Sequence, residues 1–338
     1  MIGVGVIGYG YWGPNLVRNF VESGRARVLW VCDLRDERLG EAARRHPGLK
    51  TTRDPRELIH DPALDAVAIA TPVSSHYPLA LEALEAGKHV LVEKPLAATA
   101  DDCRRLIDAA QKRRLVLMVD HTFVYTGAVR KIKLLLDEGE LGHVCYYDSV
   151  RVNLGLFQHD VNVLWDLAVH DLAIMDHVLP TLPSAVSVTG IANVAGQPVN
   201  VAYLTCLFET NTIAHFHVNW LAPVKVRRTL VGGDRRMIVY DDLEPDQKIK
   251  VYDKGVSLEE RPDRVYNMLV NYRTGDMWAP YLDRTEALRH EALHFVDCVT
   301  RHETPLTDGE AGLRVVRILE AANTSLASRG RPVAIAPA

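Results

Sequence analysis

Residues 2–13 read IGVGVIGYGYWG, an apolar run followed at once by a loop that contains three glycines. The apolar run predicts a buried strand, and Pro14 directly after the loop suits the first turn of a helix, where its missing N–H has no intrahelical partner. A strand, a glycine-rich turn and a helix in this order make a phosphate-binding βαβ unit. The stretch therefore predicts a doubly wound α/β domain at the start of the chain.

The three glycines fit the pattern G-x-G-x-x-G, in which each glycine has its own task. Gly8 allows a tight turn, Gly10 lets the backbone approach a pyrophosphate, and Gly13 lets the helix pack closely on the strand. Asp33 stands twenty residues beyond the last glycine, where a carboxylate accepts hydrogen bonds from the adenosine ribose and repels a 2′-phosphate. The spacing therefore predicts NAD rather than NADP as the cofactor, although the nearby Arg35 weakens that preference.

Three aromatic residues fill the variable positions of this loop, namely Tyr9, Tyr11 and Trp12. Packing against the domain or placement on the surface explains such residues without any ligand. The sharper hypothesis is that Tyr11 or Trp12 flanks the bound cofactor.

Short apolar runs alternate with amphipathic segments as far as residue 119. We expect strands at Ile2–Ile7, Val28–Cys32, Ala66–Ala70, His89–Val92 and Leu115–Val119. Between them, Gly87 ends one amphipathic stretch, and Thr99 with Asp102 resembles a capping box before another. Near-continuous apolar strands that alternate with helices predict a parallel sheet covered on both faces. We therefore assign residues 1–120 to a dinucleotide-binding Rossmann domain.

The pattern changes after residue 120. Helices are expected at Ala128–Glu138, Asn162–Leu179, Glu286–Thr300 and Gly309–Ala327, and strands at His143–Val152, Ala185–Ile191, Val201–Glu209, Thr212–Trp220, Lys225–Val231, Arg235–Tyr240 and Lys248–Tyr252. Successive strands joined by short turns favour a large, open, mainly antiparallel sheet. Residues 121–338 are therefore predicted to form an α+β domain, with an irregular excursion at 253–285.

Composition limits the choice of partner. The chain has 338 residues, of which 48% are hydrophobic and 24% charged, and a formal net charge of -4 without a block of Lys or Arg. This balance argues against nucleic acid or an anionic membrane surface as the main partner. No apolar stretch approaches the ~20 residues that span a bilayer, so we expect a cytoplasmic protein that acts on a small molecule. The five cysteines are scattered without a C-x-x-C pair, which favours buried, inert thiols.

Polar motifs follow two of the predicted strands. The dipeptide TP at 71–72 comes after one strand, and the tripeptide EKP at 93–95 comes after the next. Open α/β sheets bind ligands at these carboxyl ends of their strands. Further along, Asp166 and His170 stand four residues apart on a predicted helix and so share one face, where a carboxylate beside an imidazole makes a usable acid/base pair.

The glycine loop, the TP step, the run AGKHVLVEKP and the later DLAVHD at 166–171 together resemble the Gfo/Idh/MocA family of NAD(P)-dependent oxidoreductases, which act mostly on sugars and cyclitols. The resemblance covers essentially the whole chain, and EKP with the downstream D-x-x-x-H is its most specific part. It implies that Lys94 reaches a substrate hydroxyl and the nicotinamide ribose, that the bond from Lys94 to Pro95 is often cis, and that Asp166 and His170 complete the site. It also implies cofactor contacts from Thr71, Pro72, His76, Glu93 and Lys94.

Ordinary pKa values separate the roles of the catalytic candidates. Oxidation of a carbinol removes a hydride and a hydroxyl proton, and an imidazole, with a pKa near ~6.5, takes that proton at neutral pH more readily than a lysine near ~10.4. We therefore assign His170 as the general acid/base, Lys94 as the cation that stabilises the developing alkoxide, and Asp166 as the group that orients substrate or imidazole. Without the motif, Lys94 would be interpreted as a surface lysine and His170 as a core histidine.

A metal site is an alternative for the same region, because Asp166, His170, Asp171 and His177 are residue types that bind divalent ions. Relatives with this motif normally work without a metal, and hydride transfer needs none. We therefore expect no metal.

Departures from the common pattern affect the substrate. Many relatives carry a glycine between the Asp and the His, where this chain has Ala168 after the approach DVNVLW. The segments GYWGPN and VNLGLFQHDVNVLWDLAVHD most resemble members from nucleotide-sugar and surface-polysaccharide pathways. Position alone suggests substrate contacts from Tyr125, Arg151, Asn153 and Trp165.

The leading hypothesis is an NAD-dependent dehydrogenase or ketoreductase that acts on a ring carbon of a nucleotide-linked sugar. Two alternatives stay open: a cyclitol or free-sugar dehydrogenase, and a catalytically silent NAD-binding regulator, which has no need of the catalytic candidates. His215 and His217 alternate along a strand and share one sheet face, which favours a solvated or subunit-interface surface. The resemblance implies that this open sheet face forms a homodimer or homotetramer.

Overall fold

The computed structural model describes residues 1–155, 161–253, 255–258, 270–273 and 275–335. It divides into two compact units, the first made of residues 1–126 with 284–320 and the second of residues 127–283 with 321–338. The predicted boundary at 120 lies near the first of these divisions, whereas residues 284–320 differ from the prediction, which assigns them to the second domain. These residues return to the first unit because helix α8 (Ala287–Arg301) packs on helix α1 (Gly13–Glu22).

A six-stranded parallel sheet forms the centre of the first unit. Its strands are β1 (Ile2–Ile7), β2 (Ala26–Cys32), β3 (Lys50–Thr52), β4 (Ala66–Ile69), β5 (His89–Glu93) and β6 (Leu117–Asp120), in the spatial order β3-β2-β1-β4-β5-β6. Every residue of β1 and β4 is buried, as expected for strands covered on both faces. The doubly wound sheet is thus confirmed, with β3 added, a polar edge strand of three residues that carries no apolar run.

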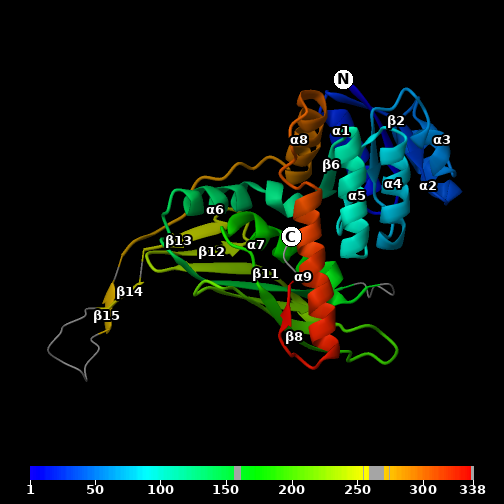
Figure 1. The fold of residues 1–338 in the computed structure, drawn as a ribbon. Helices are drawn as coiled ribbons and strands as arrows, with labels where there is room; N and C mark the ends of the chain where they lie inside the picture. The colour runs from blue at the N-terminus through cyan, green and yellow to red at the C-terminus, as the bar shows by residue number, and fades with distance from the viewer. Residues whose placement is uncertain (156–160, 254, 259–269, 274, 336–338) are drawn as a thin grey trace. The chain divides into compact units, whose positions relative to one another are not determined.

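The helices of the first unit are α1, α2 (Asp36–Arg45), α3 (Pro55–Ile59), α4 (His76–Glu85), α5 (Ala100–Arg113) and α8, with short 3-10 turns η1 (Val73–Ser75) and η2 (Thr122–Tyr125). Helices α4 and α5 lie side by side against the sheet (Figure 1). Their predicted ends are confirmed: Gly87 follows α4 with a φ of 79°, and the side chain of Thr99 caps α5 by accepting a hydrogen bond from the backbone of Asp102.

The second unit contains a nine-stranded sheet. Its strands are β7 (Val144–Leu154), β8 (Ala185–Ile191), β9 (Val201–Leu207), β10 (Ile213–Asn219), β11 (Leu221–Gly233), β12 (Met237–Asp241), β13 (Ile249–Tyr252), β16 (Met277–Trp278) and β17 (Val333–Ala334), in the order β16-β13-β12-β11-β7-β10-β9-β8-β17. The sheet is mixed rather than purely antiparallel, since β10 runs parallel to β7. The long connection between these two strands, through a helix and two further strands, permits that pairing.

The predicted irregular excursion at 253–285 contains strands. Besides β16, which extends the large sheet by pairing with β13, strands β14 (Gly255–Leu258) and β15 (Val270–Arg273) form a separate antiparallel pair. These strands have only two to four residues, too few to show a periodic pattern in the sequence.

Helices α6 (Gly127–Asp137) and α7 (Val169–Val178) pack side by side along the large sheet (Figure 1). A π-helix, η3 (Leu164–Ala168), leads directly into α7, so the predicted helix at 162–179 is confirmed with a wider first turn. The last helix, α9 (Gly309–Ala327), begins in the first unit and ends in the second.

Four of the five cysteines are buried free thiols, as predicted. The exception is Cys145, the second residue of β7, which is half-exposed, so the predicted burial is wrong for this residue. Within the described ranges, no helix is long and apolar enough to cross a membrane.

Candidate active site

The glycine loop leaves the carboxyl end of β1 and enters α1. Gly8 has a φ of 94°, and a Cβ there would lie 2.4 Å from the carbonyl oxygen of Ala70. A Cβ on Gly13 would lie 2.1 Å from the carbonyl oxygen of Gly8, so the helix starts in direct contact with the turn. Gly10 differs, because a Cβ there would meet only the guanidinium of Arg35, at 3.6 Å. The loop therefore leaves open space above Gly10.

The N-terminus of α1 suits an anion. Its N-cap residue, Trp12, makes no side-chain cap hydrogen bond, and the first turn carries no acidic residue. Tyr9 is fully buried in the core of the unit, whereas Tyr11 is exposed and stands edge-on to Trp12, with 5.4 Å between the ring centroids. The contact of Tyr11 or Trp12 with a cofactor stays a prediction.

Asp33 follows β2 and is buried beside the loop. Its carboxylate accepts hydrogen bonds from the backbone N–H of Tyr9 at 2.8 Å and of Arg35 at 3.0 Å, and from the guanidinium of Arg35 at 3.0 and 3.2 Å. Burial raises the pKa of Asp33, but these hydrogen bonds outweigh it and hold the pKa below its ordinary value. Asp33 is therefore a carboxylate at the place where the ribose of a dinucleotide binds.

The TP step and the EKP tripeptide are tied together by His76. Its Nδ1 lies 2.8 Å from the carbonyl oxygen of Pro95, and its Nε2 lies 2.8 Å from that of Thr71. Burial lowers the pKa of His76, so the neutral ring donates to one carbonyl at a time. The bond from Lys94 to Pro95 is cis, as the resemblance implied. His76 and Pro72, which opens η1, thus shape the two loops, and their contact with a cofactor stays a prediction.

Three buried carboxyl groups gather at the same sheet edge. Glu93 and Asp120 end β5 and β6 in register, and Glu291 comes from α8. Asp120 accepts a hydrogen bond from Thr122, and its charge acts on both glutamates. Burial, followed by the charge of Asp120, raises the pKa of Glu93 and of Glu291 well above the ordinary value, which favours the protonated form of both glutamates.

The sequence pattern does not single out Asp120, Glu291 or the neighbouring His121. A signal existed for Asp120, since it directly follows the predicted strand Leu115–Val119, just as Glu93 directly follows the predicted strand His89–Val92. Burial, together with the charge of Lys94, lowers the pKa of His121 to about 3, so this ring is neutral. These groups surround the start of the EKP loop, and Lys94 itself is half-buried.

In the second unit, Asp166 lies on η3 and His170 lies on α7, in one continuous helical segment. Both are half-buried. Asp166 accepts a hydrogen bond of 2.9 Å from the indole N–H of the buried Trp220. A π turn is often found at functional sites, because it redirects the side chains of its residues.

Two of the predicted substrate residues make internal contacts. Arg151 forms two parallel hydrogen bonds with Asp171, of 2.7 and 2.9 Å, with only 4% and 5% of the two side chains exposed. Tyr125 is also buried, and its hydroxyl lies 3.1 Å from that of Thr307. The inward direction of both side chains, which spacing along the sequence does not reveal, favours structural roles for them.

The other two predicted substrate residues are placed differently. Asn153 is half-buried near the end of β7. Trp165 is buried on η3, and its indole N–H finds no acceptor among the residues that the structure describes. Residues 156–160, part of the segment that resembled nucleotide-sugar enzymes, lie outside the described residues.

Two residues of the metal alternative are engaged with other side chains. Across the described ranges, no group of three or more His, Cys, Asp or Glu side chains is arranged to hold a metal ion. Asp171 is bound to Arg151, and Asp166 accepts from Trp220.

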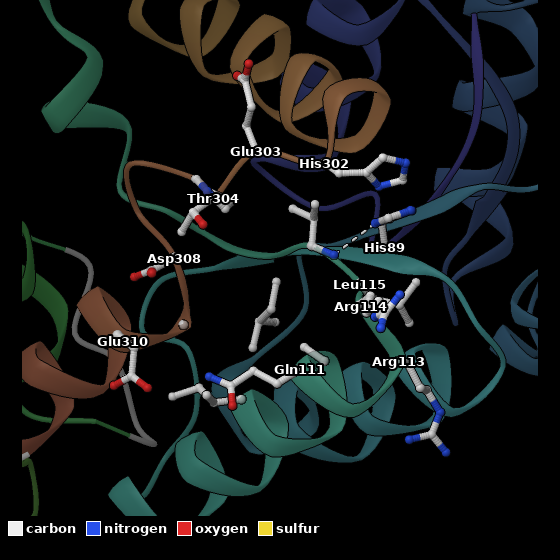
Figure 2. Close-up of a pocket in the computed structure, with 16 residues that line it drawn as sticks. His89, Gln111, Arg113, Arg114, Leu115, His302, Glu303, Thr304, Asp308 and Glu310 are labelled. Carbon is white, nitrogen blue, oxygen red and sulfur yellow. Dashed lines mark hydrogen bonds between the residues drawn. The ribbon is translucent and has the colours of Figure 1, made fainter.

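A cavity of about 810 Å³ opens at the other edge of the parallel sheet (Figure 2). It is lined by the start of β5 at His89, the start of β6, the end of α5, and residues 302–305 and 308–310. The backbone N–H of Val116 donates to Nδ1 of His89 at 2.9 Å. Because β5 and β6 begin here and end at Glu93 and Asp120, the cavity lies opposite the glycine loop. No predicted cofactor or catalytic residue lines it.

The first unit therefore has the features of a dinucleotide-binding protein. The open space above Gly10 has room for a pyrophosphate, the start of α1 offers backbone N–H groups, and Asp33 is the carboxylate that this motif places beside a ribose. These residues fit NAD.

Comparison with known proteins agrees with a dinucleotide-binding first unit. Residues 2–121 match the Gfo/Idh/MocA oxidoreductase family, NAD-binding Rossmann fold, and residues 133–335 match the C-terminal alpha/beta domain of that family. The chain belongs to the Gfo/Idh/MocA family of oxidoreductases, and its first domain is NAD-binding.

Named relatives act on sugars and cyclitols. The UDP-N-acetylglucosamine 3-dehydrogenase of Acidithiobacillus ferrooxidans is 26% identical over 92% of this chain and 93% of its own. The myo-inositol 2-dehydrogenase of Thermotoga maritima is 26% identical over 96% of each chain. The structure of levoglucosan dehydrogenase in complex with NADH and levoglucosan shares the fold, with a TM-score of 0.84 at 21% identity over 99% of this chain and 100% of that chain.

Proposed function

We propose that this protein transfers hydride between NAD and a ring carbon of a sugar, and that the sugar is nucleotide-linked. The observation that carries the proposal is the position of Lys94, directly after β5 at the sheet edge that also carries the glycine loop and Asp33. A cation at this edge can stabilise negative charge that develops on a reacting oxygen. When bound, NAD supplies the acceptor or donor of the hydride.

The proposed roles follow from the chemistry of each side chain. Lys94 donates hydrogen bonds to the substrate oxygen as it gains charge, and an imidazole nitrogen of His170 takes or returns the hydroxyl proton. Asp166 orients the substrate or the imidazole, and Trp220 fixes this carboxylate through its indole N–H. The indole N–H of Trp165 is proposed to donate to the substrate, with Asn153 as a second contact.

A cyclitol is the second candidate substrate, because the inositol dehydrogenase relative is as similar to this chain as the UDP-sugar dehydrogenase. The nucleotide-linked sugar is preferred on the likeness of the glycine loop and of the segment that leads to Asp166. A silent NAD-binding regulator is disfavoured by the presence of Lys94, Asp166 and His170 together.

The test is NADH formation by the purified protein with NAD and a panel of UDP-sugars, free sugars and inositols. Lys94→Ala and His170→Ala should each lower kcat/KM by about 10³, because each removes a group that acts on the transition state. The double variant should lose little more than either single one, as for residues that work together. Lys112→Ala, at the exposed end of α5, is the matched control and should retain full activity.

Other outcomes decide between the alternatives. Turnover of inositol without turnover of any nucleotide sugar would establish that the protein is a cyclitol dehydrogenase. If NAD binds but no substrate reacts, whether offered in its alcohol or its ketone form, the hypothesis of a silent NAD-binding regulator replaces that of a dehydrogenase.

We also propose that the open face of the large sheet forms a homodimer or homotetramer. Tyr203 is 44% exposed on this face and stacks on His217, with 4.5 Å between the ring centroids. Ile213, on the adjacent strand, is 47% exposed. Large exposed apolar side chains favour burial by a second copy. Light scattering should give a multiple of the chain mass, lowered by Ile213→Arg, and a monomeric wild type contradicts the proposal.

A further inference from the structure

The carboxylate that faces the adenosine ribose is already fully engaged. Oδ1 of Asp33 accepts from the backbone N–H and from Nε of Arg35, both at 3.0 Å. Oδ2 accepts from the backbone N–H of Tyr9 at 2.8 Å and from a terminal nitrogen of Arg35 at 3.2 Å. A carboxylate has about four acceptor positions, so the ribose hydroxyls must replace an existing partner.

Arg35 is the partner that can leave. Its side chain is 49% exposed, compared with 7% for Asp33, and an ion pair with one exposed member contributes little to stability. The two backbone donors, in contrast, are fixed by the turn. The guanidinium also lies close to Gly10, at the open space that a pyrophosphate would occupy. Arg35 therefore stands between the ribose carboxylate and the phosphate-binding turn.

The ion pair between Arg35 and Asp33 also makes the ribose position less negative than Asp33 alone would. Asp33 alone would repel the two negative charges of a 2′-phosphate, but the guanidinium next to it neutralises the carboxylate. Asp36, the next acidic residue along the chain, is paired with Arg53 at 3.3 Å. The adjacent Glu37 helps to hold the charge of Arg35, since it raises the pKa of this guanidinium after the larger effect of Asp33.

We propose that Arg35 narrows the discrimination between the two dinucleotides: it releases Asp33 when the ribose of NAD binds, and it binds the 2′-phosphate when NADP binds. NAD stays the preferred cofactor, and NADP is accepted as a weaker one. A guanidinium suits this task because its planar fork matches both a carboxylate and a phosphate. The inference concerns the cofactor alone and does not depend on the proposed substrate.

The experiment is titration calorimetry of NAD and of NADP without any sugar. Arg35→Ala should bind NADP at least about tenfold more weakly, because a charge-assisted hydrogen bond to phosphate is lost. The same variant should bind NAD as tightly as the wild type or up to about threefold more tightly, because Asp33 no longer has to exchange partners. Arg44→Ala, near the other end of α2 and also exposed, is the matched control and should change neither affinity.

Two more variants test the mechanism. Arg35→Lys keeps the charge and should retain more NADP binding than Arg35→Ala. Asp33→Asn should lose the preference for NAD, and in that background Arg35→Ala should no longer improve NAD binding. This non-additivity marks a coupled pair.

Three results would overturn the proposal. The first is a wild type that binds NAD but no NADP. The second is an Arg35→Ala variant that weakens both dinucleotides equally, which would make Arg35 a contact to the parts that they share. The third is unchanged NADP binding in that variant, which would leave a surface ion pair only. Absence of sugar turnover bears on the proposed function and leaves these affinities as they are.

Discussion

The two units differ in how well a single residue can be assigned to a ligand from the sequence alone. In the first unit, the glycine loop, Asp33 and Lys94 all follow parallel strands, and strands that run in one direction bring their carboxyl ends to one edge. In the second unit, Arg151 was chosen by its position alone, and it points inward to Asp171. The ends of parallel strands therefore meet by topology alone, whereas single positions within a mixed sheet depend on which face each side chain takes.

The largest effect is expected at the buried pair of the second unit. Arg151→Ala leaves Asp171 as an unpaired buried charge and should lower the free energy of unfolding by about 3–5 kcal/mol. Urea denaturation measures it, and Arg151→Met with Asp171→Leu should recover much of the loss. If Arg151→Ala instead keeps its stability and loses only substrate affinity, the contrast between the units fails and Arg151 is a ligand contact.

Two glycines of the first unit separate folding from binding. Gly13→Ala places a Cβ against the backbone of Gly8 and should destabilise the unit by about 1–3 kcal/mol. Gly10→Ala meets only the movable Arg35, so its unfolding free energy should stay within about 0.5 kcal/mol of the wild type. Its NAD affinity should nevertheless fall about tenfold or more, because the Cβ enters the space of the pyrophosphate. Calorimetry measures the NAD affinity of both variants, and thermal denaturation measures their stability. The assignment would be reversed if Gly10→Ala unfolds and Gly13→Ala does not.

The buried carboxyl cluster predicts a pH-dependent stability. The pKa of Glu291 is raised in the folded state, chiefly by burial and then by Asp120, so its contribution to stability is complete below the ordinary carboxyl pKa and is lost as the pH rises towards the folded value. Glu291→Gln cannot ionise, so the wild type should lose stability relative to this variant by up to about 1.4 kcal/mol per pH unit across that window. Urea denaturation between pH 4 and 8, about the window in which such a shift acts, gives the slope. A difference independent of pH would show that Glu291 is ionised in the folded protein.

The smallest effect is expected at the N-terminal cap of α5. Thr99→Ala removes the side-chain cap of α5 and should cost about 1 kcal/mol of stability, while Thr99→Ser should cost almost nothing. Thermal denaturation of the pair checks this. Equal losses for the two variants would assign the effect to packing of the threonine methyl group.

Much of the fold was visible in the sequence where short-range chemistry decides it. The bounds of β1, β8 and α9 were predicted to the residue, and Gly87 and Thr99 marked helix ends correctly. The parallel pairing of β10 with β7 and the return of residues 284–320 to the first unit were not predicted, because both depend on contacts between segments far apart in the chain. The same reason applies to Asp120 and Glu291, which meet only when β6 and α8 are packed.

The sequence by itself determined the class of the protein, because a glycine loop, an acidic residue at a fixed distance and the EKP tripeptide are local patterns, and a parallel sheet aligns them without further information. The tertiary structure decided what each side chain is free to do. It paired Arg151 with Asp171, buried three carboxyl groups together, and set Arg35 against Asp33 over the open space at Gly10. Burial and partnership depend on which surfaces meet when the chain packs, and spacing along the sequence does not contain that information.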